Sequence, residues 1–158
     1  MLKKIERAQQ LLKKEAAVFR CPTCHEPMHV EGVGLICQQR HQFDLSKKGT
    51  LYFLNHGVQT EYNKKMFTSR GKMIQSGMYA PVLNKIMHYL PQNKTVVDVG
   101  CGEGSFLAEL SQAGLSGLKI GFDLSKEGIY LASNQPIDAF WCVADLTNLP
   151  LANEGLDT

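Results

Sequence analysis

The sequence predicts an α/β protein in which a zinc-ribbon-like N-terminal domain precedes a Rossmann-like sheet. Two observations carry this prediction: a group of cysteines and a histidine near the N-terminus, and a β-branched run at residues 95–99 that leads into three closely spaced glycines. A buried strand followed by a glycine turn and a helix is the ligand-binding corner of a parallel α/β sheet. The 158 residues leave room for one small domain and part of another.

The net charge of +2 hides an asymmetry between the two halves of the chain. Residues 1–80 contain 13 Lys or Arg against 6 Asp or Glu, whereas residues 81–158 contain 4 against 9. This distribution favours an anionic partner for the first half and a cationic or neutral ligand for the second. A solvated surface could give the same counts, so the asymmetry only supports other evidence.

The N-terminal segment predicts an amphipathic basic helix over residues 1–19. We favour a helix packed on its own protein over an arm that binds RNA. The segment lacks the apolar core of a signal peptide, and no apolar run approaches the ~20 residues of a membrane span. We therefore expect a cytoplasmic protein that makes no contact with a membrane.

The strongest local signal is the pattern C-x2-C-x12-C-x3-H, formed by Cys21, Cys24, Cys37 and His41. Each pair presents two ligands, and two pairs complete a tetrahedron around zinc that leaves no position open for chemistry. A disulfide is disfavoured in a cytoplasmic chain. A redox C-x-x-C would need a helix after its first cysteine and a thioredoxin-like βαβ unit, and the sequence shows neither. A structural zinc domain over residues 20–54 is the favoured interpretation.

Glycines and apolar residues between and after the cysteine pairs predict the strands of this domain. A hairpin is expected around residues 32–34. Residues 42–54 predict two further short strands around a turn at residues 46–49, and we expect both to complete the zinc domain. Its expected core comprises Phe43, Leu45, Leu51 and Phe53.

Residues 55–90 predict a helical linker region. One helix is expected over residues 62–76, where Gly77 is a plausible stop. Pro81 suits the first turn of a second helix, which Pro91 should end.

The glycine loop has the pattern D-x-G-x-G-x-G, formed by Asp98, Gly100, Gly102 and Gly104. A dinucleotide fingerprint would require a glycine where Ser105 stands, and the Gly-Lys-Ser/Thr end of a P-loop is absent. The pattern resembles the first motif of the class I methyltransferases, which bind S-adenosylmethionine. Asp98 suits the ammonium of this cofactor, and backbone N–H groups at a helix N-terminus suit its carboxylate.

Two further aspartates follow strands expected at residues 118–122 and 139–143. Asp123 lies 23 positions after Gly100, close to the ~20 typical of an acid that binds ribose hydroxyls. Asp145 follows the third strand, whose end lies beside the adenine in the methyltransferases that the loop resembles. The alternative for each aspartate is a helix N-cap or a turn residue.

The combined motifs resemble the bacterial 23S ribosomal RNA (guanine-N1)-methyltransferases. The resemblance rests on the cysteine–histidine pattern, RHQFDLSKKG at 40–49, SGMYAPV at 76–82 and the loop VVDVGCGEG. It implies a zinc domain that recognises RNA, a class I methyltransferase domain that binds S-adenosylmethionine, and methylation of guanine N1 in an RNA hairpin. It also implies that Tyr79, Gly102 and Glu103 lie at the cofactor.

The chain departs from that family in its length. Residues 91–158 correspond to the N-terminal part of the cofactor-binding domain, and residues 155–158 look like the start of a fourth strand. The strand at residues 95–99 should then lie at a sheet edge, where a second copy could pair with it and form a homodimer.

No residue can be assigned as the catalytic base from the sequence. Two other functions remain open at this point: a non-catalytic zinc-containing module that binds RNA or protein, and a small-molecule methyltransferase whose zinc domain is only structural.

Overall fold

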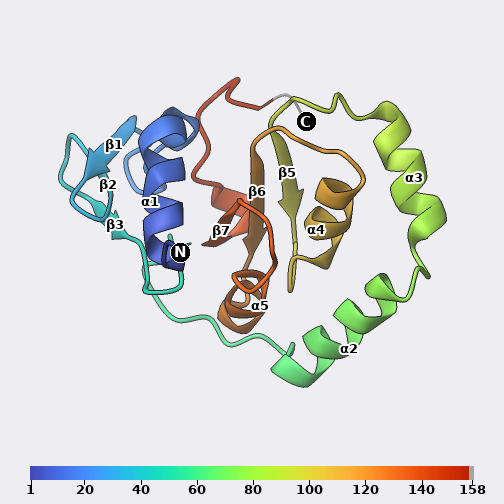
Figure 1. The fold of residues 1–158 in the computed structure, drawn as a ribbon. Coiled ribbons are helices and arrows are strands. Elements are labelled where there is room, and N and C mark those ends of the chain that lie inside the picture. Colours follow the sequence, from blue (N-terminus) through green and yellow to red (C-terminus); the bar gives the residue numbers. More distant parts are fainter. Residues whose placement is uncertain (157–158) are drawn as a thin grey trace.

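The structure is a computed structural model that describes residues 1–156. It contains a three-stranded antiparallel sheet in the order β1-β2-β3 (Met28–Glu31, Gly34–Cys37 and Gln42–Asp44). A four-stranded parallel sheet has the order β4-β7-β6-β5 (Thr50–Tyr52, Phe140–Val143, Lys119–Asp123 and Val96–Val99). The helices are α1 (Lys4–Glu15), α2 (Lys64–Gln75), α3 (Ala80–Tyr89), α4 (Ser105–Gln112) and α5 (Lys126–Ala132), with 3-10 turns η1 (Ala16–Val18) and η2 (Leu146–Asn148). Figure 1 shows α1 and the antiparallel sheet together beside the parallel sheet.

The antiparallel sheet is the expected ribbon. Gly32 has a φ of +60°, which a glycine adopts without strain and which closes the hairpin between β1 and β2. Gly34 packs so closely on β3 that an added Cβ would lie 2.2 Å from the Phe43 carbonyl oxygen. The hairpin predicted from the sequence is confirmed.

Strand β4 corrects one expectation about the zinc domain. Residues 42–54 do form two short strands, but only β3 joins the ribbon. Strand β4 pairs in parallel with β7, so that Thr50 lies opposite Trp141. The physical reason is apolar burial: Leu51 and Phe53 are buried in the same core as Phe140 and Cys142 of the parallel sheet.

Helix α1 packs on the parallel sheet rather than projecting into solvent. Its apolar face contributes the buried Ala8 and Leu12 to the core shared with β6 and β7. Arg7 forms an ion pair with Asp138 at 2.5 Å, just before β7. This confirms the expectation of a helix packed on its own protein.

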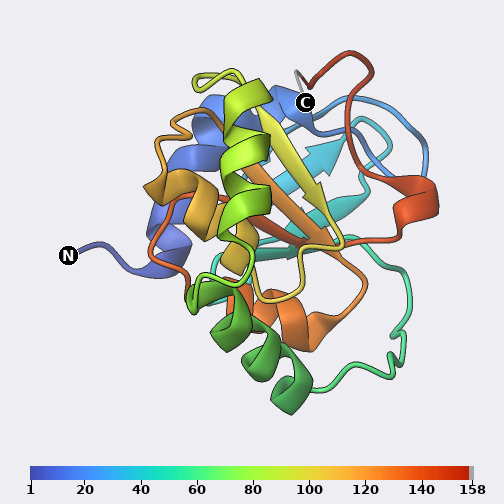
Figure 2. The same cartoon turned by 90° about the vertical axis from the view of Figure 1, so that its right-hand side faces the viewer.

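Helices α2 and α3 follow the predicted boundaries within two residues. Asn63 caps α2 by accepting a hydrogen bond from the Met66 N–H at 3.0 Å. Gly77, with a φ of +86°, ends the segment after α2, and Pro81 lies in the first turn of α3. Figure 2 shows both helices on the side of the molecule away from the ribbon.

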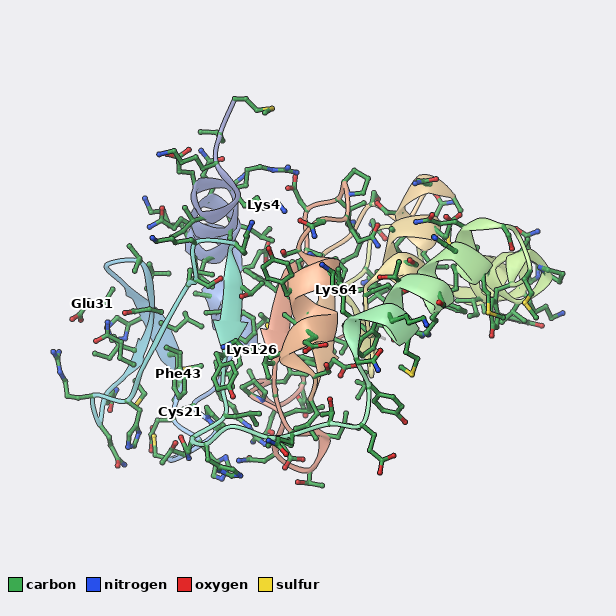
Figure 3. All side chains as sticks on the ribbon, turned by 90° about the horizontal axis from the view of Figure 1, so that it is seen from below. Lys4, Cys21, Glu31, Phe43, Lys64 and Lys126 are labelled. Carbon is green, nitrogen blue, oxygen red and sulfur yellow. The ribbon has the colours of Figure 1, made fainter. Side chains whose placement is uncertain are left out.

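Two apolar cores lie on the two faces of the parallel sheet. On one face, Ile120 and Phe122 of β6 pack with α1, β4 and the ribbon. On the other face, Trp141 and Val143 of β7 pack with residues of α3, α4 and α5. Because the ribbon and the sheet share the first core, they form one packed body; Figure 3 shows the ribbon, with Glu31 and Phe43, on one side and α2, from Lys64, on the other.

Strand β5 occupies the edge of the parallel sheet, as the sequence predicts. Its Val99 is 46% exposed. Within the predicted start of a fourth strand, Gly155 and Leu156 are not in a strand, and residues 157–158 lie outside the described part of the chain. No helix in residues 1–156 has both the length and the apolar character needed to cross a membrane.

Candidate functional site

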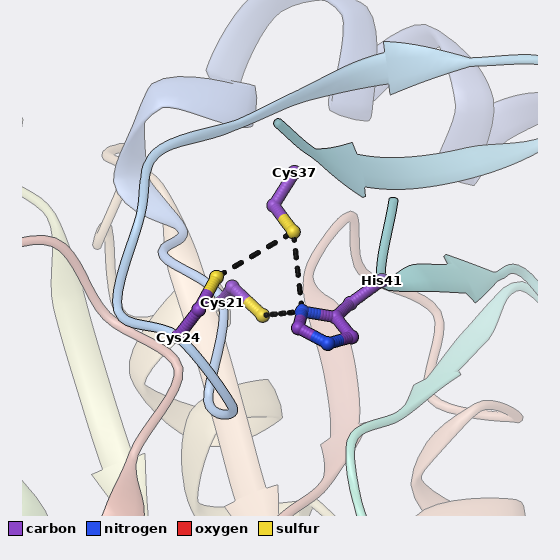
Figure 4. A group of neighbouring side chains, drawn as sticks. All are labelled: Cys21, Cys24, Cys37 and His41. Atoms are coloured by element: carbon purple, nitrogen blue, oxygen red, sulfur yellow. Dashed lines mark hydrogen bonds between the residues drawn. The ribbon is translucent and has the colours of Figure 1, made fainter. Parts of the chain in front are cut away.

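The four predicted metal ligands converge in the ribbon. The sulfur atoms of the three cysteines and a ring nitrogen of His41 all lie within 4.8 Å of one another (Figure 4). The Sγ atoms of Cys24 and Cys37 are 3.6 Å apart, and His41 Nδ1 is 3.5 Å from Cys21 Sγ and 3.4 Å from Cys37 Sγ.

These distances fit a tetrahedral zinc ion. Bonds of about 2.3 Å to sulfur and about 2.0–2.1 Å to nitrogen separate two sulfurs by roughly 3.8 Å, and a sulfur from a nitrogen by roughly 3.5 Å. Three thiolates and one imidazole are the soft and borderline donors that zinc prefers. The arrangement is closed, so the metal would stabilise the ribbon rather than take part in chemistry.

Local backbone turns position the ligands. Cys21 accepts a hydrogen bond from the His25 N–H through its carbonyl, and Cys37 accepts one in the same way from the Arg40 N–H. His25 and Arg40 both have positive φ, at +62° and +68°, which lets each knuckle reverse direction within a few residues. The side chain of His29 lies instead beside Glu31 on the exposed face of β1, outside the cluster.

The thiols of the cluster differ in acidity. Burial raises the pKa of Cys24 to about 11, and its hydrogen bond with Cys37 adds to the increase. Burial also raises the pKa of Cys37, but hydrogen bonds from the His41 backbone and from Cys24 outweigh burial and bring that pKa down to about 7. Cys37 is therefore more readily converted to a thiolate ligand than Cys24.

The glycine loop connects β5 to α4, and each of its glycines has a positive φ. A side chain at Gly102 would meet Arg70 Nη1 at 2.3 Å, and one at Gly104 would meet the Trp141 ring at 2.6 Å. At Gly100, by contrast, nothing lies within 4 Å of an added Cβ. The loop is packed against α2 and the sheet on one side and is open at Gly100, where a ligand can approach the backbone closely.

Asp98 and Asp123 lie at the adjacent ends of β5 and β6. Burial raises the pKa of Asp98, as do the neighbouring charges of Glu103 and Asp123, whereas Arg70 opposes the increase. Asp123 accepts hydrogen bonds from the N–H groups of Gly102 at 2.9 Å and Ser125 at 2.7 Å. Asp123 thus holds the glycine loop against β6, a role that the sequence alone does not reveal.

Asp145 and Tyr79 stand at the starts of η2 and α3, respectively. Asp145 caps η2, and hydrogen bonds from the backbone and hydroxyl of Thr147, both to Oδ1, lower its pKa. It follows β7, whose Val143 lies opposite Asp123 in the sheet. The Tyr79 ring packs edge-on against Phe106 of α4, with 5.7 Å between the ring centroids.

Glu103 lies at the N-terminus of α4. Its side chain is buried, and Oε1 accepts a hydrogen bond of 3.4 Å from the Ser105 N–H, the first N–H of the helix. Its Oε2 forms an ion pair with Arg70 Nη1 at 3.0 Å. A carboxylate of the chain itself therefore lies beside the first N–H of α4, at the helix end where the sequence suggested that the cofactor carboxylate binds.

Arg70 is the residue of this region that the sequence reasoning missed. It extends from α2 to the glycine loop, where Nη1 donates to the Cys101 carbonyl at 3.3 Å as well as to Glu103. A signal was available, because Arg70 shares the helix face of the buried Phe67, Gly71 and Ile74. A charged residue on the apolar face of an amphipathic helix requires a buried partner.

Comparisons with known proteins give the same two parts in the same order. Residues 19–55 match the family described as "RlmA, N-terminal", a zinc ribbon, and residues 96–158 match a methyltransferase domain family. The chain thus combines a zinc ribbon with the first part of a methyltransferase fold. The zinc and S-adenosylmethionine expected from the sequence are the cofactors of this combination.

Two curated relatives carry the name predicted from the motifs. A putative 23S rRNA (guanine-N(1)-)-methyltransferase of Bacillus subtilis, YxjB, is 37% identical over 153 residues, covering 89% of this chain and 54% of the relative. The 23S rRNA (guanine(748)-N(1))-methyltransferase of Streptomyces fradiae is 26% identical over 147 residues, covering 88% and 52%. The resemblance to the 23S rRNA (guanine-N1)-methyltransferases is confirmed. The chain spans about half the length of the curated relatives it matches.

A solved structure, the plantazolicin methyltransferase BpumL in complex with SAH, also aligns with the chain. The two are 21% identical with a TM-score of 0.44, covering 57% of this chain and 37% of the other. The assignment of the fold rests on the strand order and the matched families instead.

Proposed function

We propose that the protein transfers a methyl group from S-adenosylmethionine to N1 of a guanine in a hairpin of 23S ribosomal RNA. The observation that carries the proposal is that a Cys3His ribbon and a sheet with a D-x-G-x-G-x-G loop pack together as one body. The names of the two relatives support the same reaction and substrate. A ribosomal RNA substrate would also place the protein in the cytoplasm.

The proposed chemistry is an in-line displacement. When bound, S-adenosylmethionine supplies an electrophilic methyl group on a sulfonium; guanine N1 forms the new N–C bond while the S–C bond breaks, and the N1 proton must leave. We assign no residue of residues 1–156 as the base that removes this proton. The contribution of the chain to the rate would be positioning, because both reactants must be held in line, and the guanine must be unstacked to expose its edge.

We propose specific roles for the residues around the loop. The cofactor would approach the backbone closely at the open side of Gly100, and Asp98 would face its ammonium. The remaining lone pairs of Asp123 would accept from the ribose, and Asp145, at the end of β7, from the adenine amine. Gly102, Gly104 and Glu103 would shape the loop, and Tyr79 would border it beside Phe106.

We retain the four-part division of the chain as a proposal, with residues 1–19, 20–54, 55–90 and 91–158 as helix, zinc domain, helical linker and cofactor domain. The pairing of β4 with β7 gives the second part a strand in the sheet of the fourth. This link is the reason to treat the ribbon and the cofactor domain as one mechanical unit.

A homodimer stays a prediction. The outer edge of β5 has no strand beside it among the described residues, and Val99 is exposed there. Such an edge can pair with the same edge of a second copy. Sedimentation of the protein at several concentrations tests this, and a single monomeric species at all of them would contradict it.

The decisive experiment is methyl transfer from labelled S-adenosylmethionine to unmodified 23S ribosomal RNA. N1-methylguanine blocks the Watson–Crick edge, so the product is located by the position at which reverse transcription stops. Gly102→Val is the control, since a side chain at a φ of +56° would strain the loop and block close approach of the cofactor to the backbone, which should abolish cofactor binding while leaving the ribbon intact. RNA binding without methyl transfer would favour the non-catalytic module instead.

A further inference from the structure

Arg70 projects from α2 onto the rim of the glycine loop. Its Nη1 lies against Gly102 and donates hydrogen bonds to the Cys101 carbonyl and to Glu103. The side chain is 38% exposed, so the guanidinium is only partly enclosed by the protein. Figure 1 shows α2 and α4 as neighbouring elements of this side of the molecule.

Only part of the guanidinium is used by the described residues. Both hydrogen bonds come from Nη1, and within residues 1–156 no protein acceptor is recorded for Nη2 or Nε. A guanidinium carries five N–H donors in a rigid planar fork that matches a carboxylate. Glu103 thus holds Arg70 through Nη1 and leaves the donors on Nη2 and Nε without an acceptor among the described residues.

The charges around the loop indicate which ligand group would bind the remaining donors of Arg70. The charges of Glu103 and Asp123 both act on Asp98, and Arg70 is the cation that acts on it. An incoming carboxylate would have to compete with Glu103 for the first N–H of α4, which donates to Glu103 at 3.4 Å. A zwitterionic amino-acid group would therefore place its ammonium near the acids and its carboxylate at Arg70.

We propose that Arg70 binds the carboxylate of S-adenosylmethionine and that Glu103 is a positioning residue for Arg70. This inference rests on the proposed function and goes further by naming the group that selects the amino-acid end of the cofactor. A charge-assisted, two-point hydrogen bond between a guanidinium and a carboxylate is among the stronger polar contacts in proteins.

The test is a double-mutant cycle in which one change is made in the protein and one in the ligand, and the affinities are measured by calorimetry. Wild-type protein and the Arg70→Met variant are titrated with S-adenosylmethionine and with decarboxylated S-adenosylmethionine, which retains the ammonium and the nucleoside. We expect Arg70→Met to weaken binding of the first ligand about 10- to 100-fold and to leave binding of the second unchanged. Lys72→Met, which removes an exposed charge from the same helix, should alter neither affinity.

Each outcome decides the matter. Equal loss of both ligands in Arg70→Met would overturn the inference and reduce Arg70 to a contact that holds α2 on the loop. Failure of the wild type to bind either ligand would overturn the proposed function as well. If Arg70→Met does not fold, Arg70→Lys keeps the charge without the fork, and a several-fold loss confined to the carboxylated ligand is then expected; no such loss refutes the proposal.

Discussion

The cysteine–histidine cluster of the ribbon and the region around the glycine loop are built in two different ways. In the ribbon, two short turns bring all four ligand atoms within 4.8 Å, and each ligand is positioned by its immediate neighbours in the chain. At the glycine loop, the relevant groups come from α2, β5, β6 and the end of β7, and they are held by contacts distant in sequence. The metal site is therefore a local structure, whereas the cofactor site is a property of the assembled sheet.

The two constructions are nevertheless joined. Strand β4 pairs with β7, and Asn148 Nδ2, shortly after β7, donates to the Pro22 carbonyl of the first zinc knuckle at 2.8 Å. A disturbance of the metal should therefore reach the strand ends of the parallel sheet. The following predictions test how separate the two regions are.

The largest effect should come from removing a metal ligand. Cys24→Ala should release zinc and unfold residues 20–54, because binding of structural zinc supplies about 10–16 kcal/mol in small zinc domains. Metal analysis and hydrogen exchange over these residues measure the two effects. His29→Ala, an exposed histidine outside the cluster, should keep its metal. A ribbon that stays protected from exchange in Cys24→Ala would contradict the local character of this site.

A smaller effect is expected where the two regions meet. Leu51 in β4 is fully buried in the shared core, and Leu51→Ala should lower the free energy of unfolding by about 2–5 kcal/mol. The ribbon and the sheet should lose stability together in one transition, measured by denaturant unfolding with zinc present. The matched change Tyr52→Ala, at a position of the same strand that is 37% exposed, should cost less. Two separate transitions in Leu51→Ala would show that the regions are independent.

At the cofactor site, Asp123→Ala should weaken S-adenosylmethionine binding by about 1–3 kcal/mol, because it leaves ribose hydroxyls and the Gly102 N–H without their acceptor. Zinc content should not change. Asp123→Asn keeps one acceptor oxygen, and its affinity for S-adenosylmethionine, measured by calorimetry, should lie between those of the wild type and Asp123→Ala. Unchanged affinity in both variants would place the ribose elsewhere.

The smallest effect concerns Asp98, and its sign depends on pH. Burial raises the pKa of Asp98 above its ordinary value of 3.8, so the folded state binds this proton more tightly than the unfolded chain does. The residue therefore costs stability as pH rises above 3.8, and the cost is complete once pH exceeds its folded pKa. Asp98→Asn should be more stable than wild type at neutral pH, with the gain shrinking towards pH 3.8, and it should bind the cofactor more weakly.

This prediction is best measured as the difference in unfolding free energy between the two proteins across pH, since acid also protonates the zinc ligands of both. A gain that persists below pH 3.8 would show that the ionised carboxylate is not its cause.

The sequence by itself determined the features that depend on short spacing. The four zinc ligands, the hairpin at Gly32 and the strand–loop–helix unit at Gly100 follow from residue types within a few positions of one another, because knuckles, turns and caps are made by adjacent backbone.

Only the tertiary structure decided the rest. In the folded chain β4 pairs in the parallel sheet instead of the ribbon, and the Glu103 side chain accepts a hydrogen bond from the first N–H of α4. Arg70 contacts the glycine loop from α2. Apolar burial is not directional, and several strands or side chains of the chain could serve as partners for burial or for an ion pair. The sequence therefore does not show which distant segments come together. The partner of each was settled by how the whole chain packs.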